Sequence, residues 1–255
     1  MSWQDRFSLR GRKALVTGAS KGIGAEICAV FADAGADIVA LGRDPADLAA
    51  TAQAVRACGR RCLTLTAEMG SPTEPVSACE QALKDWGTID ILVNAAGIAN
   101  VAPAVDFLTE DWDRMMAVNL RAPFLTARTL APAMIAQRWG KIINISSQTG
   151  VIALDEHAAY AASKGGLNAL TKSLCAEWAR HNVQVNAICP TVVMTPMGKA
   201  VWGRPEKGDP FRNATPARRF AEPVEVADAA LYLASDASAM VNGALLMVEG
   251  GFTSV

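Results

Sequence analysis

A tyrosine, a lysine and a serine in the second half of the chain have the spacing of a proton-transfer site. Tyr160 and Lys164 are four residues apart, and Ser147 lies thirteen residues before the tyrosine. Residues four apart share a face of a helix, and an ammonium beside a phenol lowers a phenol pKa that is normally about 10. The Ser147 hydroxyl would then hold a carbonyl oxygen in front of the phenol. A half-buried tyrosine with a surface lysine at helical spacing has the same pattern, so the rest of the chain must decide.

The elements that would position these residues alternate between apolar, β-rich runs and longer helical patterns. Strands are expected at residues 14–17, 38–41, 63–66, 89–93, 141–145, 183–188 and 244–248. Helices are expected after the first strand to about residue 34, and at 45–57, 75–86, 110–137, 160–180 and 224–233, with Pro123 and Pro132 as kinks or a break in the long one. This alternation predicts an α/β fold with right-handed βαβ units and a parallel sheet that is covered on both faces. We expect a single domain over residues 1–255, with an irregular segment at 191–221 that acts as a substrate lid.

Composition excludes several classes of function. Of the 255 residues 51% are hydrophobic and the net charge is −1, so no strong field attracts nucleic acid or an anionic membrane. The first twelve residues lack the apolar core of a signal peptide, and no apolar run is long enough to span a bilayer. The six cysteines lie mostly among apolar neighbours, which favours reduced thiols and no metal site. We therefore expect a soluble, cytoplasmic protein.

A glycine-rich run directly after the first expected strand is typical of a phosphate-binding turn. Gly18, Gly22 and Gly24 stand in Thr-Gly-Ala-Ser-Lys-Gly-Ile-Gly, and a helix begins there. Glycines let the backbone approach a pyrophosphate, and the helix N-terminus offers free N–H groups and a positive dipole. The strand–turn–helix context predicts a dinucleotide cofactor.

The end of the second strand should select between the two nicotinamide dinucleotides. An acidic residue there would accept the ribose hydroxyls and repel a 2′-phosphate. The chain instead reads Leu-Gly-Arg43-Asp44, and Arg43 with Lys21 of the glycine turn would hold a 2′-phosphate. Asp44 weakens this case, and both cations would also suit a solvated surface. We predict that NADP(H) is preferred and that NAD(H) is possible.

The order of these motifs along the chain resembles the classical short-chain dehydrogenases/reductases. The resemblance rests on the glycine turn, on Asn-Ala-Ala-Gly at 94–97 after the fourth strand, and on Asn119, Ser147, Tyr160 and Lys164, and it covers essentially the whole chain. It implies a single Rossmann-type, doubly wound domain with seven mostly parallel strands, and a homotetramer. It also implies an oxidoreductase that transfers a hydride between a nicotinamide cofactor and a small ketone or alcohol.

The resemblance also implies the roles of the site residues. Ser147 orients the carbonyl, Tyr160 is the general acid in reduction, Lys164 lowers the pKa of the tyrosine and binds the nicotinamide ribose, and Asn119 kinks its helix and holds a water in a proton relay. Asn94 and Gly97 would line the cofactor channel, and Val193 and Thr195 would contact the carboxamide. The full set expected at the cofactor is Gly18, Ser20, Lys21, Gly22, Ile23, Gly24, Arg43, Glu68, Met69, Asn94, Ala95, Gly97, Tyr160, Lys164, Pro190, Val193 and Thr195.

Three positions depart from the family pattern. Ala95 replaces a second Asn, Glu68 replaces an Asp that contacts adenine, and Thr191 replaces a Gly. The run from Pro190 to Thr195 instead resembles dicarbonyl/L-xylulose reductases. In that group a Gln, a His and a Trp line the substrate pocket together with the catalytic Ser, and Gln148, His157 and Trp202 occupy those positions beside Ser147. These side chains would suit a hydroxylated ketone or a small diketone.

Two other functions stay open on the sequence. A 3-oxoacyl-[acyl-carrier-protein] reductase would have the same catalytic residues and would dock its acidic carrier on two basic residues beside the site. Arg138 occupies one of those positions, but His181, neutral at pH 7, occupies the other. A catalytically silent dinucleotide-binding sensor or scaffold is disfavoured by the intact Asn119, Ser147, Tyr160 and Lys164.

Overall fold

The computed structural model describes residues 2–255, and its centre is a sheet of seven strands in the order β3-β2-β1-β4-β5-β6-β7. Every pair of neighbouring strands is parallel. The strands are β1 (Lys13–Thr17), β2 (Asp37–Gly42), β3 (Cys62–Thr66), β4 (Ile91–Asn94), β5 (Gly140–Ile145), β6 (Val183–Pro190) and β7 (Leu245–Val248). The order runs outward in both directions from β1 and β4, so the sheet has its topological switch point between those two strands.

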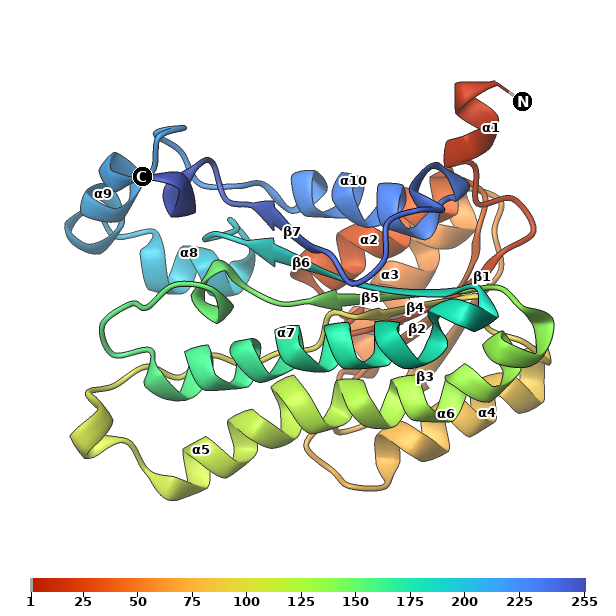
Figure 1. Cartoon of the computed structure of the whole chain (residues 1–255), viewed down its shortest axis with the longest axis horizontal. Helices are drawn as coiled ribbons and strands as arrows, with labels where there is room; N and C mark the ends of the chain where they lie inside the picture. The colour runs from red at the N-terminus through yellow and green to blue at the C-terminus, as the bar shows by residue number, and fades with distance from the viewer. Residues whose placement is uncertain (1) are drawn as a thin grey trace.

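Helices cover both faces of this sheet (Figure 1). One face carries α2 (Gly22–Asp33), α3 (Pro45–Ala57) and α10 (Pro223–Ala234). The other carries α4 (Glu74–Trp86), α5 (Thr109–Met116), α6 (Ala122–Gln137) and α7 (Ala158–Trp178). The predicted doubly wound, Rossmann-type α/β fold is therefore confirmed.

The hydrophobic core is divided by the sheet into two layers. In β1, Ala14 and Val16 face one layer and Leu15 faces the other, as the two-residue period of a strand requires. All three side chains are fully buried. Strands that are apolar on both faces are typical of a parallel sheet with helices on each side.

Several elements differ from the sequence expectations. The long helix expected at 110–137 is interrupted by one wider π-helical turn, η2 (Ala117–Arg121), which runs directly into α6 with Pro123 in its first turn. A short helix α1 (Trp3–Phe7), capped by Ser2, was not expected. The 191–221 segment is not irregular, because it contains α8 (Pro196–Trp202) and α9 (Pro205–Ala214).

Short 3₁₀ turns complete the chain: η1 (Ala104–Asp106), η3 (Gln148–Gly150), η4 (Ala179–His181), η5 (Asp236–Ser238) and η6 (Phe252–Ser254).

Two further expectations concern the cysteines and the membrane. All six cysteines are free thiols, as predicted. Within residues 2–255, no helix has the length and apolar character needed to cross a bilayer.

Lys141, in β5, is the largest buried charged side chain outside the site and gives a stability prediction. It is 2% exposed, and its Nζ donates to Ser238 Oγ at 3.2 Å. Burial lowers its pKa from 10.5 to about 8, which the Asp236 charge partly offsets. The unfolded chain therefore binds this proton more tightly, so the charged lysine destabilises the fold below about pH 8, and the penalty fades as pH rises toward 10.5.

We expect Lys141→Met to raise the free energy of unfolding at pH 7 by about 1–3 kcal/mol, because an unbranched apolar side chain removes the cost of burying the charge. Urea denaturation at pH 7 and at pH 10 measures it, and the gain should shrink at pH 10. Lys84→Met, at an exposed position of α4, is the control and should give no gain. A loss of stability at pH 7 in Lys141→Met would show that the Ser238 hydrogen bond outweighs the burial cost.

Candidate active site

A cavity of about 800 Å³ opens at the carboxyl ends of β1, β2, β4, β5 and β6. This is the volume of a cofactor or small-molecule site, and it lies at the switch point of the sheet. The residues predicted from the sequence that line it are Gly18, Ser20, Lys21, Gly22, Ile23, Gly24, Arg43, Glu68, Met69, Ala95, Gly97, Ser147, Gln148, His157, Tyr160, Lys164, Pro190, Val193, Thr195 and Trp202.

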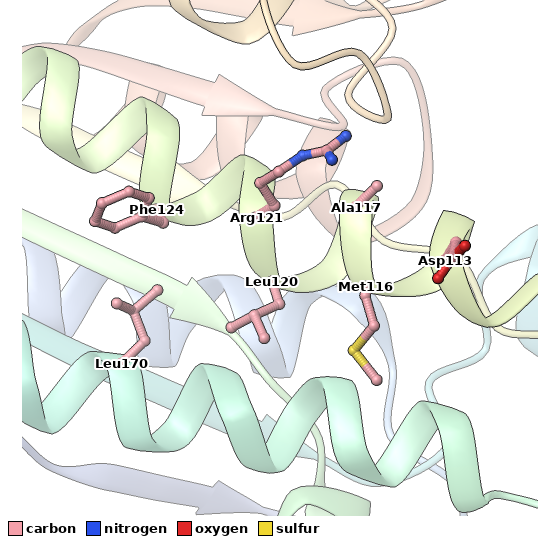
Figure 2. Close-up of a pocket in the computed structure, with 7 residues that line it drawn as sticks. All are labelled: Asp113, Met116, Ala117, Leu120, Arg121, Phe124 and Leu170. Carbon is pink, nitrogen blue, oxygen red and sulfur yellow. The ribbon is translucent and has the colours of Figure 1, made fainter.

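A second, open groove of about 570 Å³ lies where α5, η2 and α6 pass over α7 (Figure 2). Its lining is Asp113, Met116, Ala117, Leu120, Arg121, Phe124 and Leu170. None of the predicted site residues lines this groove, so the larger cavity is the candidate active site.

At one end of the cavity the glycine turn joins β1 to α2 in a conformation that suits phosphates. Gly18 has φ +67°, and a Cβ there would lie 2.8 Å from the backbone of Ala96; a Cβ on Gly24 would overlap the carbonyl oxygen of Gly18. Among residues 2–255 no side chain caps the N-terminus of α2, so its first N–H groups are available to a ligand. Thr17 Oγ1 accepts hydrogen bonds from the N–H groups of Ala95 and Ala96, each at 3.1 Å, which fixes the loop opposite. These features fit a dinucleotide pyrophosphate.

The ribose end beside this turn carries both predicted cations. Arg43 Nη1 lies 3.4 Å from Glu68 Oε2, and Lys21 Nζ lies 3.8 Å from Asp47 Oδ2. Asp44 is occupied elsewhere, because its Oδ1 accepts from the N–H groups of Ala46 and Asp47 and so caps α3. The nearest acidic residue after β2 therefore has a structural role in capping α3, and it also lines the ribose end of the cavity.

The catalytic pair lies on one face of α7, and Lys164 is buried there. Its Nζ donates to the carbonyl of Ile145 at 2.8 Å and lies 5.7 Å from the centroid of the Tyr160 ring. Burial lowers the pKa of Lys164 to about 8. Burial also raises the pKa of Tyr160, against the opposing effect of a hydrogen bond with Ser147. The net effect of the packed site is thus a raised phenol pKa, which keeps Tyr160 in the acid form that ketone reduction requires. That Lys164 lowers the phenol pKa against this effect of burial stays a prediction.

The Ser147 hydroxyl is oriented by a residue that the sequence analysis missed. Thr149 donates twice to Ser147 Oγ, from its backbone N–H at 3.2 Å and from its Oγ1 at 2.8 Å. Because Ser147 Oγ accepts both bonds, its own proton is left for the Tyr160 oxygen or for a carbonyl oxygen beside it. A Ser-x-Thr turn of this kind is a known local pattern and was readable in the sequence.

We expect Thr149→Val to lower kcat for ketone reduction by roughly 2- to 10-fold, the worth of one neutral hydrogen bond, and to leave dinucleotide affinity unchanged. Steady-state kinetics and a fluorescence titration of the cofactor measure the two effects. Thr149→Ser keeps the hydroxyl and should restore kcat. Equal kcat in the Val and Ser variants would contradict a positioning role for the Thr149 hydroxyl.

Asn119 and Asn94 are the two predicted site residues that do not line the cavity. Asn119 lies in the π-helical turn and is fully buried; its Oδ1 accepts from the N–H of Ile98, and its Nδ2 donates to Ile98 O and Ser163 Oγ. The helix widens to a π turn at Asn119, and the kink and the role in a water relay stay predictions. Asn94 was expected to line the cofactor channel, and this is wrong, because its amide is buried against Asn144 and Thr126. It holds β4 to β5 and to α6 instead.

The comparisons with known proteins agree with this geometry. A family model described as "Enoyl-(Acyl carrier protein) reductase" matches residues 18–253. A D-threitol dehydrogenase of Mycolicibacterium smegmatis (strain ATCC 700084 / mc(2)155) is 41% identical over 97% of this chain and 95% of its own length. An L-xylulose reductase of Bos taurus is 40% identical, with coverage of 96% and 97%. A gluconate 5-dehydrogenase from Burkholderia cenocepacia J2315, solved in complex with NADP and tartrate, superposes with a TM-score of 0.95 at 39% identity over the whole of both chains.

The chain belongs to the short-chain dehydrogenase/reductase family. It is an oxidoreductase of CH–OH groups with a nicotinamide dinucleotide as its cofactor, and the predicted enzyme class is confirmed. The cofactor supplies the hydride-carrying carbon when it is bound, and the chain supplies the position and the proton.

At the substrate end of this dehydrogenase/reductase the predicted pocket residues come together. Gln148 is 2% exposed, and its Oε1 has no hydrogen-bond partner among the described residues. His157 Nδ1 donates to the carbonyl of Asp155 at 2.5 Å, which leaves Nε2 as the nitrogen that can bond a substrate. The His157 ring lies edge-on to the Tyr160 ring, with centroids 6.3 Å apart. Trp202 packs on Phe211 at 4.9 Å. Their binding of substrate stays a prediction, which the unpartnered Gln148 oxygen supports.

The segment 191–221 forms one wall of the cavity. Its base is closed by a parallel bridge between Val193 and Ala221, and its α9 is anchored where Phe211 stacks on Phe252 with centroids 4.7 Å apart. Leu154, Met197, Val201 and Phe211 add apolar lining that the sequence analysis did not identify. That the segment opens and closes as a lid stays a prediction.

Proposed function

We propose that this enzyme interconverts a neutral ketose or small dicarbonyl compound with the corresponding secondary alcohol, and that it prefers NADP(H) over NAD(H). The observation that carries the substrate class is the charge of the cavity. Its charged lining residues are Lys21, Arg43, Asp44, Asp47, Glu68, Arg114 and Lys164. All of these except Lys164 belong to the ribose end. Arg114 is included there because its charge helps to lower the pKa of Glu68. Lys164 is bound to Ile145.

Among the described residues, no further cation lines the substrate end; the Lys207 ammonium lies outside the lining, 5.2 Å from the centroid of the Trp202 ring. The lining of the substrate end beyond Ser147 and Tyr160 is polar but uncharged, or apolar: Gln148, Leu154, His157, Val192, Met197, Val201, Trp202 and Phe211. A carboxylate buried here would lack a cationic partner, which costs several kcal/mol. Hydroxyl groups, by contrast, can donate to the unpartnered Oε1 of Gln148. This combination supports a neutral, hydroxylated substrate.

In the proposed reaction Ser147 donates a hydrogen bond to the carbonyl oxygen and so holds that oxygen in front of Tyr160. Tyr160 then gives its phenolic proton to that oxygen as the carbon is reduced. Lys164, held by Ile145, keeps a positive charge close to the phenol and so stabilises the phenolate that remains.

The positions of Arg138 and His181 count against the alternative of a 3-oxoacyl-[acyl-carrier-protein] reductase, because both lie far from the cavity. Arg138 lies two residues before the start of β5, and His181 lies two residues before the start of β6, so both lie at the amino edge of the sheet. The cavity lies at the carboxyl edge, and a six-residue strand spans roughly 20 Å. The expectation that these two residues flank the site is wrong within one chain. A homotetramer and a cytoplasmic location stay predictions.

The test is a substrate panel with NADPH and with NADH: L-xylulose and other ketoses, diacetyl, 5-ketogluconate and an acetoacetyl thioester. We expect the highest kcat/KM for a neutral ketose or for diacetyl. We also expect Gln148→Leu to lower kcat/KM for ketoses by roughly 10-fold, while diacetyl, which has no hydroxyl, changes little. A clear preference for the sugar acid or for the thioester would reject the proposal.

A further inference from the structure

The ribose end of the cofactor site contains as many carboxylates as cations. Lys21, Arg43 and Arg114 line it with Asp44, Asp47 and Glu68. At neutral pH the three positive and three negative charges cancel. A 2′-phosphate carries up to two negative charges, and it binds best where cations are in excess. The carboxylates at the ribose end should therefore limit the proposed preference for NADP(H).

Glu68 is the carboxylate in direct contact with the main candidate for phosphate binding. Its Oε2 lies 3.4 Å from Arg43 Nη1, and both side chains are about half exposed. The other pair, Lys21 with Asp47, is longer at 3.8 Å. A guanidinium that already faces a carboxylate must give up or share this contact when a phosphate arrives.

Glu68 is also held in its position. Its Oε1 accepts from the N–H of Gly70 at 3.0 Å, and its own N–H donates to Glu74 Oε2 at 2.8 Å. The Gly70 hydrogen bond, and then the charge of Arg43, lower the pKa of Glu68, so it is ionised at neutral pH. Its second oxygen therefore stays beside Arg43 as a fixed negative charge.

We propose that Glu68 is a specificity-determining residue that opposes the 2′-phosphate. Its carboxylate competes with the phosphate for Arg43, and in the absence of a phosphate it holds the guanidinium to one side, which leaves room for the free 2′-hydroxyl of NAD(H). The residue thereby keeps the enzyme able to use both cofactors. This inference rests on the proposed binding of the 2′-phosphate by Arg43.

Calorimetric titration with two cofactor fragments, adenosine 2′,5′-bisphosphate and 5′-AMP, tests Glu68 without any turnover. Glu68→Gln keeps the amide oxygen for Gly70 but removes the charge. We expect the ratio of its affinity for the bisphosphate to its affinity for 5′-AMP to rise roughly 5- to 20-fold over the wild type, the effect of one partly screened charge near a phosphate. Glu177→Gln removes an exposed carboxylate of α7, outside the cavity, and should change neither affinity.

Parallel titration of Arg43→Ala separates the two ways of failing. An unchanged or lower ratio in Glu68→Gln, while Arg43→Ala lowers it, would overturn the role of Glu68 and leave the proposed cofactor site standing. An unchanged ratio in both variants would mean that the 2′-phosphate does not reach Arg43, and the proposed NADP(H) preference would fail as well. Retained 5′-AMP binding shows in each case that the variant is folded.

Discussion

Tyr160→Phe should lower kcat for ketone reduction by at least about 10³-fold and leave the dissociation constant of the dinucleotide within about twofold, because general acid catalysis contributes 10² to 10⁴ in rate. The substitution removes the phenolic oxygen alone. The ring, which lies 6.3 Å from His157 and 5.7 Å from Lys164 Nζ, keeps its packing. Steady-state kinetics with a saturating ketone and fluorescence titration of the cofactor give the two numbers.

The chain provides a matched control for this experiment. Tyr232, the other of its two tyrosines, lies on α10 against Phe7 and outside the cavity. Tyr232→Phe should therefore retain kcat. Turnover of Tyr160→Phe above a few per cent of the wild type would mean that another group supplies the proton.

The same assignment fixes the sign of the pH dependence in the wild type. Burial raises the pKa of Tyr160 in the free enzyme, so the acid form needed for reduction is present at neutral pH. For reduction, kcat/KM should be flat near neutral pH and fall at high pH. For alcohol oxidation it should rise with pH, because the phenolate is then the base.

The sequence predicted the sheet and the catalytic set because both depend on local patterns. Apolar runs that alternate with helical patterns specify β1 to β7, and the glycine turn must follow the first strand to accommodate its close approach to Ala96. Ser147, Tyr160 and Lys164 then meet at one edge of the sheet, because a parallel sheet brings its carboxyl ends together.

What the sequence analysis misjudged depends on contacts between distant residues or on burial. Nothing local to Asn94 shows that Asn144 and Thr126 will take up its amide. The spacing of Lys164 and Tyr160 predicts a shared helix face, but the sign of the phenol pKa shift depends on desolvation, which only the packed site shows. The role of Asp44 was readable, since an Asp before a Pro at a helix start is a typical cap.

The choice between NADPH and NADH should depend on the two cations at the ribose end, Arg43 and Lys21. With Asp44 bound to the start of α3, Arg43 and Lys21 are the groups near the end of β2 that can receive a 2′-phosphate. A hydrogen bond to a charged group contributes about 1.5–3 kcal/mol, but Glu68 and Asp47 already face these cations, so the lower value applies to each.

Replacing Arg43 and Lys21 together by Ala should therefore lower the ratio of kcat/KM for NADPH to that for NADH by about 100-fold, with each single variant near 10-fold. Nearly all of the loss should appear as a higher KM for NADPH, because the cations lie at the ribose end and not at Tyr160. Lys84→Ala, which removes an exposed cation of α4 outside the cavity, should leave the ratio unchanged. If the double variant kept the wild-type ratio, the 2′-phosphate would have to bind elsewhere, and the charges at the end of β2 would be solvated surface residues.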